Sequence, residues 1–156
     1  MTAESSLRLR AAHQSEAAAI AALSRLHVEH GLRWRWTPAR VRRQMRDPDT
    51  MTLVASVDGH LAGFAIMHFG EVRARLVLLA VDALHRRGGI GSSLLDWLEK
   101  SCVTAGIQEI RLEVRAGNTG AQQFYLGHGF RVAGRIAGYY DGKESALLMA
   151  KALAAA

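Results

Sequence analysis

Hydrophobic and polar residues alternate along this chain with two different periods, which predict strands and helices in succession. Apolar residues at every second position, or in short unbroken runs, predict seven strands near residues 6–10, 51–57, 61–69, 75–81, 110–115, 130–137 and 144–149. Apolar residues three or four apart predict four helices near residues 15–31, 37–47, 90–106 and 118–127. The resulting order, β-α-α-β-β-β-α-β-α-β-β, predicts an α/β fold with a mixed sheet and helices on both of its faces.

Glycine, proline and small polar residues mark where these elements begin and end. Ser15 is the expected cap of the first helix and Gly31 its expected end. Thr37-Pro38 is a favoured start for the second helix. Asp58-Gly59 predicts a tight hairpin turn, and the last two strands are expected to join across residues 139–142.

Length and cysteine content limit the kind of protein this is. The sequence has 156 residues, enough for one domain with a sizeable core, which we expect to span residues 1–156. No apolar run approaches the roughly 20 residues that cross a membrane, and residues 1–10 lack the apolar stretch of a signal peptide. The single cysteine, Cys102, excludes an internal disulfide bond and favours a cytoplasmic location. Because Cys102 continues the apolar stripe of its helix, we expect it to pack in the core.

The charge is positive and concentrated in one segment. The formal net charge of +6 favours anionic partners. Two tryptophans, Trp34 and Trp36, are surrounded by the basic residues Arg33, Arg35, Arg40, Arg42, Arg43 and Arg46. We interpret this segment as a solvated helix face or a site for an acidic substrate, and direct nucleic-acid binding as less expected. The seven histidines have no recognisable ligand spacing, so no metal is expected.

A glycine-rich basic loop lies between the strand that ends at Val81 and the next helix. It reads Arg86-Arg87-Gly88-Gly89-Ile90-Gly91-Ser92. Glycines let the backbone approach a ligand closely, and the first turn of a helix offers unpaired N–H groups to an anion. Two arginines add charge that suits phosphate oxygens. The loop is therefore a candidate phosphate-binding site, although the same glycines could serve only a strand-to-helix turn.

The spacing of the glycines separates this loop from two common phosphate-binding motifs. No Gly-Lys-Ser/Thr follows the glycines, which excludes a Walker A loop, and the G-x-G-x-x-G spacing is absent. The pattern Arg86-x-x-Gly89-x-Gly91 instead resembles the pyrophosphate-binding signature of the GNAT superfamily of N-acetyltransferases. That resemblance implies a GNAT-like fold and acetyl-CoA as co-substrate.

A second motif carries the same resemblance. Residues 118–130 resemble the family signature N-x-x-A-x-x-F-Y-x-x-x-G-F, and Asn118 is placed to cap a helix. The resemblance implies that acetyl-CoA lies where the strand ending at Val81 separates from the strand containing Glu113. The implied cofactor-binding residues are Leu79, Val81, Arg86, Arg87, Gly88, Gly89, Ile90, Gly91, Ser92 and Asn118.

Direct transfer of an acetyl group to an amine needs a proton acceptor and a proton donor. The resemblance implies that Tyr125 is the donor, because the family tyrosine at this position lies beside the thioester sulfur. Glu113, the one acidic residue in the alternating segment 110–115, is the expected base. A surface ladder of ion pairs with its arginine neighbours is the alternative reading of Glu113. His68 and Glu71 are further candidates for the base.

The C-terminal segment bears on the acceptor. Tyr139-Tyr140, followed by D-G-x-E-x-A-x-x-M, resembles protein N-terminal acetyltransferases, notably the bacterial enzymes that acetylate the N-terminal alanine of a ribosomal protein. The resemblance implies a protein α-amine as acceptor, with Tyr139, Tyr140, Trp34 and Trp36 as substrate-binding residues. An α-amine is also neutral more often than a lysine at physiological pH.

Other functions and assemblies remain open from the sequence. A small-molecule amine, such as an amino-acid analogue, is the alternative acceptor. The basic loop around Trp34 departs from what we expect of a loop that faces a peptide. A non-catalytic acetyl-CoA-binding module is a further alternative. The protein is expected to be a monomer or a homodimer.

Overall fold

The computed structural model describes residues 6–86 and 88–153 and contains one seven-stranded sheet. The strands are β1 (Leu7–Ala11), β2 (Thr50–Val57), β3 (His60–Phe69), β4 (Arg73–Val81), β5 (Glu109–Arg115), β6 (Arg131–Tyr140) and β7 (Glu144–Ala152). The α-helices are α1 (Ala17–His27), α2 (Pro38–Arg46), α3 (Ile90–Thr104) and α4 (Thr119–Gly127), and two short 3₁₀ helices are η1 (Gln14–Glu16) and η2 (Ala83–His85). The predicted order of seven strands and four helices is confirmed.

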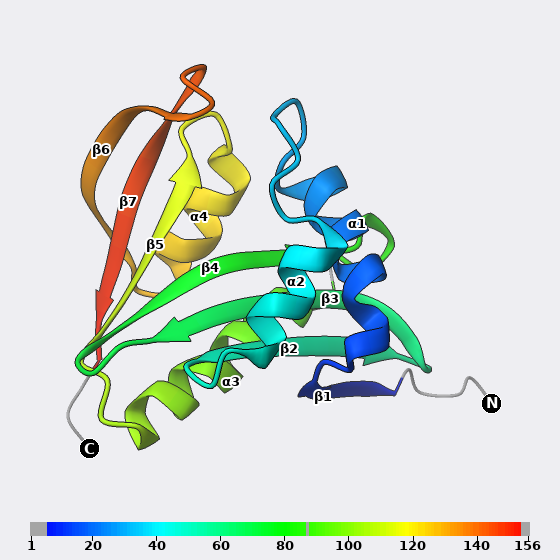
Figure 1. Cartoon of the computed structure of the whole chain (residues 1–156). Helices are drawn as coiled ribbons and strands as arrows, with labels where there is room; N and C mark the ends of the chain where they lie inside the picture. Colours follow the sequence, from blue (N-terminus) through cyan, green and yellow to red (C-terminus); the bar gives the residue numbers. More distant parts are fainter. Residues whose placement is uncertain (1–5, 87, 154–156) are drawn as a thin grey trace.

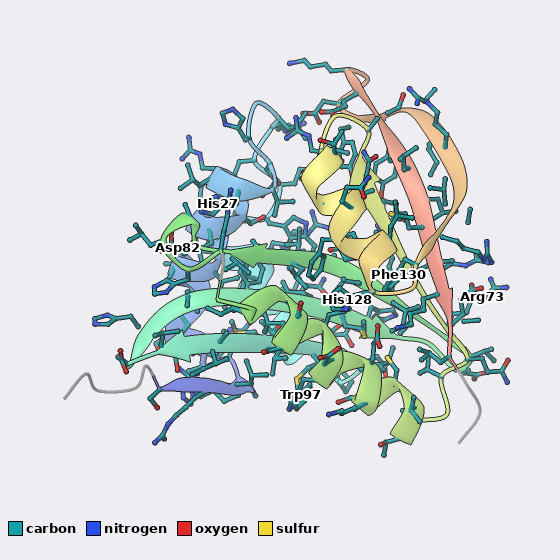
Figure 2. The ribbon with its side chains drawn as sticks, turned by 180° about the vertical axis from the view of Figure 1, so that it is seen from behind. His27, Arg73, Asp82, Trp97, His128 and Phe130 are labelled. Carbon is teal, nitrogen blue, oxygen red and sulfur yellow. The ribbon has the colours of Figure 1, made fainter. Side chains whose placement is uncertain are left out.

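Helices cover both faces of the sheet (Figure 1). α1 and α2 pack on one face and bury a core that includes Ile20, Val41 and Phe64. α3 packs on the other face against β2, β3 and β4 with Leu94 and Leu98, and Figure 2 shows this face with α4 beside α3. The central strands are therefore covered by helices on both faces, as expected for strands whose side chains are apolar on both sides.

The sheet divides in its middle, between β4 and β5. Its strand order is β1-β2-β3-β4-β5-β7-β6, and the parallel pair β4–β5 is joined only from Arg73–Leu76 to Glu109–Leu112. Beyond these residues β4 continues to Val81 and β5 to Arg115 without pairing with each other, and the two strands diverge in Figure 1. β5 stays paired with β7 along its whole length. The divergence leaves unpaired backbone groups on the facing edges of β4 and β5.

Three of the predicted boundaries are wrong. Ser15 does not cap α1 but lies inside η1, where the Glu16 carboxylate instead accepts a hydrogen bond from the His13 N–H at 2.8 Å. α1 ends at His27 rather than near Gly31, because the amides of residues 28 and 29 both bond to the Ser24 carbonyl. Gly31 adopts a positive φ of 76° in the turn that follows.

The third error concerns the hairpin between β6 and β7. β6 extends to Tyr140, which pairs with Glu144, so the two tyrosines lie in the strand rather than in the connection. The turn is shorter than predicted, since Asp141 and Gly142 both adopt positive φ and reverse the chain. Tyr140 is therefore held by strand pairing, and Tyr139 precedes it in the same strand.

Several local predictions are confirmed. Thr37 caps α2 by accepting a hydrogen bond from the Arg40 amide, and Asp58-Gly59 turns the β2–β3 hairpin with positive φ at both residues. Cys102 is fully buried beside Met67, and burial raises the pKa of its thiol to about 11, so it is unreactive at neutral pH. Among the described residues, no helix has the length and apolar character needed to span a membrane.

Candidate active site

Two pockets meet where β4 and β5 diverge. We call the first the strand pocket: it is about 80 Å³ and lies between the separated strands and α4. We call the second the loop pocket: it is about 270 Å³ and lies between the α1–α2 loop and the β6–β7 hairpin. The residues that line both pockets are Val28, Val77, Leu78, Glu113 and Tyr140. A ligand in one pocket therefore lies next to a ligand in the other, with Glu113 at the junction.

Glu113 projects from β5 on the face of the sheet opposite the core that contains Leu94 and Leu98 of α3. Its neighbours Leu112 and Val114 are buried, so the alternation of the strand directs Glu113 into the junction. Its Oε2 accepts a hydrogen bond from Arg75 Nε on β4 at 3.0 Å, and Arg75 also donates to the Tyr139 hydroxyl at 3.0 Å. The other oxygen of Glu113 has no hydrogen-bond partner within the part of the chain that the structure describes. The carboxylate is thus oriented through one oxygen, while the other is available to a ligand.

The ion pairs on this face of β5 differ from the predicted ladder, because Glu113 pairs with neither Arg111 nor Arg115. Glu109 pairs with Arg111, Arg115 pairs with Glu144, and Glu113 pairs with Arg75. Glu113 therefore forms its ion pair with the neighbouring strand β4, where the two pockets meet, and not with the arginines of its own strand.

Tyr125 reaches the strand pocket from α4. Asn118 caps this helix by accepting a hydrogen bond from the Ala121 amide, as predicted. The Tyr125 side chain is only 7% exposed and packs edge-on against Phe124 and Phe130. Burial, and then the neighbouring Tyr140, raise the pKa of the Tyr125 phenol, so the group stays protonated at neutral pH. We find no partner for its hydroxyl among residues 6–86 and 88–153, so it is available as a donor.

Tyr139 and Tyr140 follow each other along β6 and both line the loop pocket. Their rings meet edge-to-face at 4.9 Å. Burial, and then the neighbouring Tyr139 and Glu113, raise the pKa of Tyr140. Tyr140 also lines the strand pocket, so its hydroxyl is a hydrogen-bonding group close to Glu113.

The glycine-rich loop joins the end of β4 to α3. Gly89 is the residue before α3 and adopts a positive φ of 75°, which turns the chain into the helix. Gly91 lies against the Phe124 ring and Val81, where an added Cβ would contact the ring at 3.4 Å. Ile90 is buried, and the Ser92 hydroxyl shares a hydrogen bond with His128 at 3.0 Å. The first amides of α3 have no helical acceptor, as at any helix start, so they are free to bind an anion.

The remaining residues predicted to bind the cofactor are spread around the strand pocket. Leu79 and Asn118 line the pocket itself, whereas Val81 pairs with Gly63 of β3 on its other side. The exposed residue Arg86 donates to Nδ1 of His27 at 2.7 Å. Gly88 is exposed in the loop, and Arg87 lies outside the described residues.

The tryptophans predicted to bind substrate differ in position. Trp36 lines the loop pocket and is buried, with the Arg40 guanidinium 4.0 Å above its ring. Trp34 is not among the lining residues of either pocket and packs against the core on the α1–α2 side, below Arg25. His68 and Glu71, at the far end of β3 and in the turn after it, line neither pocket. In the described residues no group of three His, Cys, Asp or Glu side chains could hold a metal.

Comparison with known proteins supplies the family. The model of the acetyltransferase (GNAT) family matches residues 17–130. The chain belongs to the GNAT acetyltransferase family. This match includes the glycine-rich loop and all the residues that line the strand pocket except Tyr140.

Individual proteins similar to this chain are also N-acetyltransferases by name. The [ribosomal protein bS18]-alanine N-acetyltransferase of Escherichia coli K12 is 38% identical over 96 residues, which are 60% of this chain and 65% of the relative. The match thus spans slightly less than two thirds of that relative. The crystal structure of the ribosomal-protein-S18-alanine N-acetyltransferase from Escherichia coli has a TM-score of 0.81 at 27% identity, covering 97% of this chain and 96% of that one. The PaiA N-acetyltransferase of Thermoplasma acidophilum, solved with coenzyme A, has a TM-score of 0.78 at 22% identity, covering 94% and 99%, which shows a shared fold.

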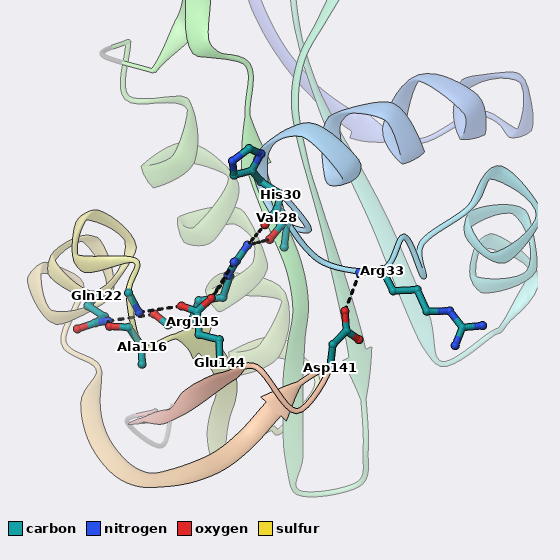
Figure 3. A network of polar contacts seen from close by, with 9 residues as sticks. Val28, His30, Arg33, Arg115, Ala116, Gln122, Asp141 and Glu144 are labelled. Atoms are coloured by element: carbon teal, nitrogen blue, oxygen red, sulfur yellow. Dashed lines mark hydrogen bonds and ion pairs between the residues drawn. The ribbon is translucent and has the colours of Figure 1, made fainter.

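Long-range contacts join the two sides of the GNAT sheet above the loop pocket, and the sequence did not reveal them. Figure 3 shows Arg115 donating to the carbonyls of Val28 and His30, at 3.2 and 2.6 Å, while it also binds Glu144. Asp141 accepts from the Arg33 amide at 2.6 Å, and that bond, followed by the Arg35 guanidinium, lowers the pKa of the Asp141 carboxyl. These contacts fix the α1–α2 loop against the end of β5 and against the β6–β7 hairpin.

Glu29 organises the α1–α2 loop of this GNAT domain from within. Its carboxylate is buried and accepts hydrogen bonds from the Ser24 hydroxyl at 2.8 Å and from the amides of Arg35 and Trp36 at 2.7 and 3.1 Å. No basic side chain forms an ion pair with Glu29 in the described residues. Glu29 thus acts as an acceptor for backbone N–H groups that would otherwise be buried without a partner.

Replacing Glu29 by alanine is expected to lower the free energy of unfolding by about 2–3 kcal/mol, because two backbone amides lose their acceptor. For a domain of this size, that corresponds to a fall in Tm of roughly 5–10 °C, measurable by calorimetry. Glu71→Ala, in an exposed turn, is the matched control and should change the free energy of unfolding by less than about 0.5 kcal/mol. Equal melting temperatures for the two variants would contradict this role of Glu29.

Gly89 allows a sharper test of the glycine-rich loop. An added Cβ at Gly89 meets no atom within 4 Å, so a substitution acts through the positive φ and not through a clash. Gly89→Val should reorient the first amides of α3 and weaken acetyl-CoA binding about 10-fold, since a left-handed conformation costs a non-glycine residue about 1–2 kcal/mol. Titration calorimetry measures the affinity.

Gly106 provides the matched control for Gly89. It has a φ of 79°, equally open surroundings, and lies at the other end of α3. Gly106→Val should therefore strain the backbone to a similar degree without changing acetyl-CoA affinity. Unchanged acetyl-CoA affinity in both variants would show that the glycine-rich loop is not part of the acetyl-CoA-binding site.

Proposed function

We propose that this protein is an acetyl-CoA-dependent N-acetyltransferase that acetylates the α-amine of a protein N-terminus. The observation that carries the proposal is the meeting of two pockets at Glu113, with the protonated Tyr125 in one pocket and Tyr139 and Tyr140 in the other. Family membership and the named activity of the Escherichia coli relative support it.

The strand pocket and the glycine-rich loop fit acetyl-CoA. The unpaired edge of β4 at Leu79 and Val81 offers backbone groups to the amides of a pantetheine arm. The first amides of α3, from Gly89 to Ser92, suit a pyrophosphate, because the helix start combines free N–H groups with a partial positive charge. Arg86 and Asn118 flank this path.

Glu113 and Tyr125 serve opposite proton transfers in this proposal. Acetyl-CoA supplies an activated thioester; the amine nitrogen forms a bond to its carbonyl carbon, and the carbon–sulfur bond breaks. Glu113 accepts the proton that the amine loses, directly or through a water molecule, at the oxygen that Arg75 does not occupy. Tyr125 donates a proton to the departing sulfur, and its buried, protonated phenol suits a donor.

The loop pocket supports a chain end as the acceptor. An α-amine has a pKa near 8, so roughly a tenth or more is neutral at physiological pH, whereas a lysine near 10.4 is almost entirely charged. A single carboxylate base is therefore better matched to an α-amine. The Tyr139 and Tyr140 hydroxyls and the neighbouring backbone offer hydrogen bonds to an extended peptide.

The test is a comparison of acetyl-CoA turnover on peptides with free N-termini and on small amines, including amino-acid analogues. Peptides beginning with Ala or Ser should be acetylated, and the same peptides with a blocked α-amine and an internal lysine should not. Acetylation of a small amine with no turnover on any peptide would replace the proposed acceptor by the small-molecule alternative. No turnover on either set would contradict the catalytic proposal.

A further inference from the structure

Arg40 is a cation without a carboxylate partner in the loop pocket. Its side chain extends from the first turn of α2, where its amide is fixed by Thr37, and its guanidinium lies 4.0 Å from the centre of the Trp36 ring. No ion pair joins Arg40 to a carboxylate of residues 6–86 and 88–153. A guanidinium stacked on an aromatic face keeps its N–H donors at its edges, where they are available to a ligand.

The carboxylates around the loop pocket are engaged elsewhere. Glu113 binds Arg75, Asp141 binds Arg35, and Glu29 accepts from two backbone amides and the Ser24 hydroxyl. The acidic groups of the pocket therefore orient other parts of the site, and none of them forms an ion pair with Arg40.

Other charges also make the environment of Arg40 suited to an anion. Burial lowers the pKa of Arg40, Glu29 opposes this effect, and the nearby Arg35, Arg43 and Arg75 add to the lowering. A partly buried cation among three like charges gains more from an anionic ligand than an exposed surface arginine does. The position and surroundings of Arg40 thus suit the binding of an anionic group.

We propose that Arg40, held on Trp36, binds an acidic side chain in the second or third residue of the acceptor peptide. Arg40 and Glu113 line the same pocket of about 270 Å³, and an extended peptide advances about 3.3 Å per residue, so a chain whose α-amine lies at Glu113 passes Arg40 within its first residues. The inference rests on the proposed N-terminal acetylation and specifies which N-termini are preferred. Arg40 is a specificity residue, with no part in the proton transfers.

The experiment uses three peptides that begin with Ala and differ only in residues two and three, which are Glu, Gln or Lys. Wild-type protein should acetylate the acidic peptide with a kcat/KM at least about 10-fold above that of the basic one, as expected for one charge-assisted contact. The preference should decrease as salt is raised.

Three variants separate Arg40 from the general positive charge. Arg40→Met keeps a long apolar stem on Trp36. It should bring the ratio of kcat/KM for the Glu peptide to kcat/KM for the Gln peptide close to one. Arg40→Lys should restore part of the ratio, because it restores the charge without the planar fork. Arg42→Ala removes an exposed arginine of the same helix that lines neither pocket, and it should keep the wild-type ratio.

The outcomes distinguish this inference from the proposed function. Peptide acetylation without an acidic preference, or with a preference that survives in Arg40→Met, overturns the role of Arg40 and leaves N-terminal acetylation intact. Equal failure of all three peptides contradicts the proposed acceptor itself and the peptide-binding role of Arg40 with it.

Discussion

Tyr125→Phe is expected to lower kcat about 100-fold while the dissociation constant of acetyl-CoA changes less than about threefold. The substitution removes one hydroxyl from a buried ring and keeps the aromatic contacts with Phe124 and Phe130. General acid catalysis by a positioned side chain contributes about 10²–10⁴-fold, so loss of the donor should appear in turnover. Single-turnover kinetics together with titration calorimetry separate the two effects.

Two further measurements distinguish loss of the proton donor from a general loss of stability in Tyr125→Phe. The melting temperature of Tyr125→Phe should stay near that of the wild type, since no hydrogen bond of the hydroxyl is found in the described part of the chain. A thiol with a lower pKa than that of coenzyme A, carrying the same acetyl group, needs less protonation as it leaves, and should reduce the deficit. Wild-type turnover in Tyr125→Phe would return this residue to a packing role.

Glu113→Gln is expected to reduce kcat/KM about 100-fold at pH 7, and the deficit should shrink towards pH 9.5. At pH 7 most α-amines carry a proton that a base must remove, whereas at pH 9.5 nearly all are neutral. The pH profile of kcat/KM on one peptide measures this change. A residue that only supports Arg75 would give a deficit that does not depend on pH.

Glu109 provides the matched control for Glu113. It lies on the same strand and face, pairs with Arg111, and lines neither pocket. Glu109→Gln should therefore lose its ion pairs with Arg73, Arg111 and Arg131 while keeping catalytic activity. A similar loss in both variants would indicate that the ladder on β5, rather than a base at Glu113, explains the effect.

Most of the fold follows from local sequence features, which explains both the confirmed and the wrong predictions. Asp58-Gly59 specifies its turn through the backbone conformations these residues favour, and no distant contact is needed. Ser15 is as plausible a local signal for a helix start, but the Glu16 carboxylate accepts the capping hydrogen bond instead. Gly31 is as plausible a signal for a helix end, but the Ser24 carbonyl ends α1 earlier by accepting from two amides. The position of Tyr140 in β6 depends on pairing with β7, which no local pattern specifies.

The candidate site is predicted less completely than the fold, because much of its geometry comes from contacts between distant segments. Resemblance to the family signatures pointed to Tyr125 and the glycine-rich loop, and the alternation along residues 110–115 pointed to Glu113. The partners that orient them were not foreseen: Arg75 lies 38 residues from Glu113, and His27 lies 59 residues from Arg86. The basic segment was interpreted as a solvated helix face or a site for an acidic substrate. In the structure Arg33, Arg35 and Arg40 line the loop pocket, whereas Arg42, Arg43 and Arg46 are exposed outside it.

The bonds of Arg115 and Asp141 to the α1–α2 loop give the loop pocket a fixed rim. Widening this rim would break contacts to Val28, His30 and Arg33 together, so the opening resists adjustment to a bulky partner. If the protein acetylates a chain end, as proposed, a helix about 10 Å across or a folded surface loop would require more of these contacts to open than a single extended strand would. Acceptors would thus be selected by their state of folding as well as by their residues, which favours termini that are unstructured or still emerging from synthesis.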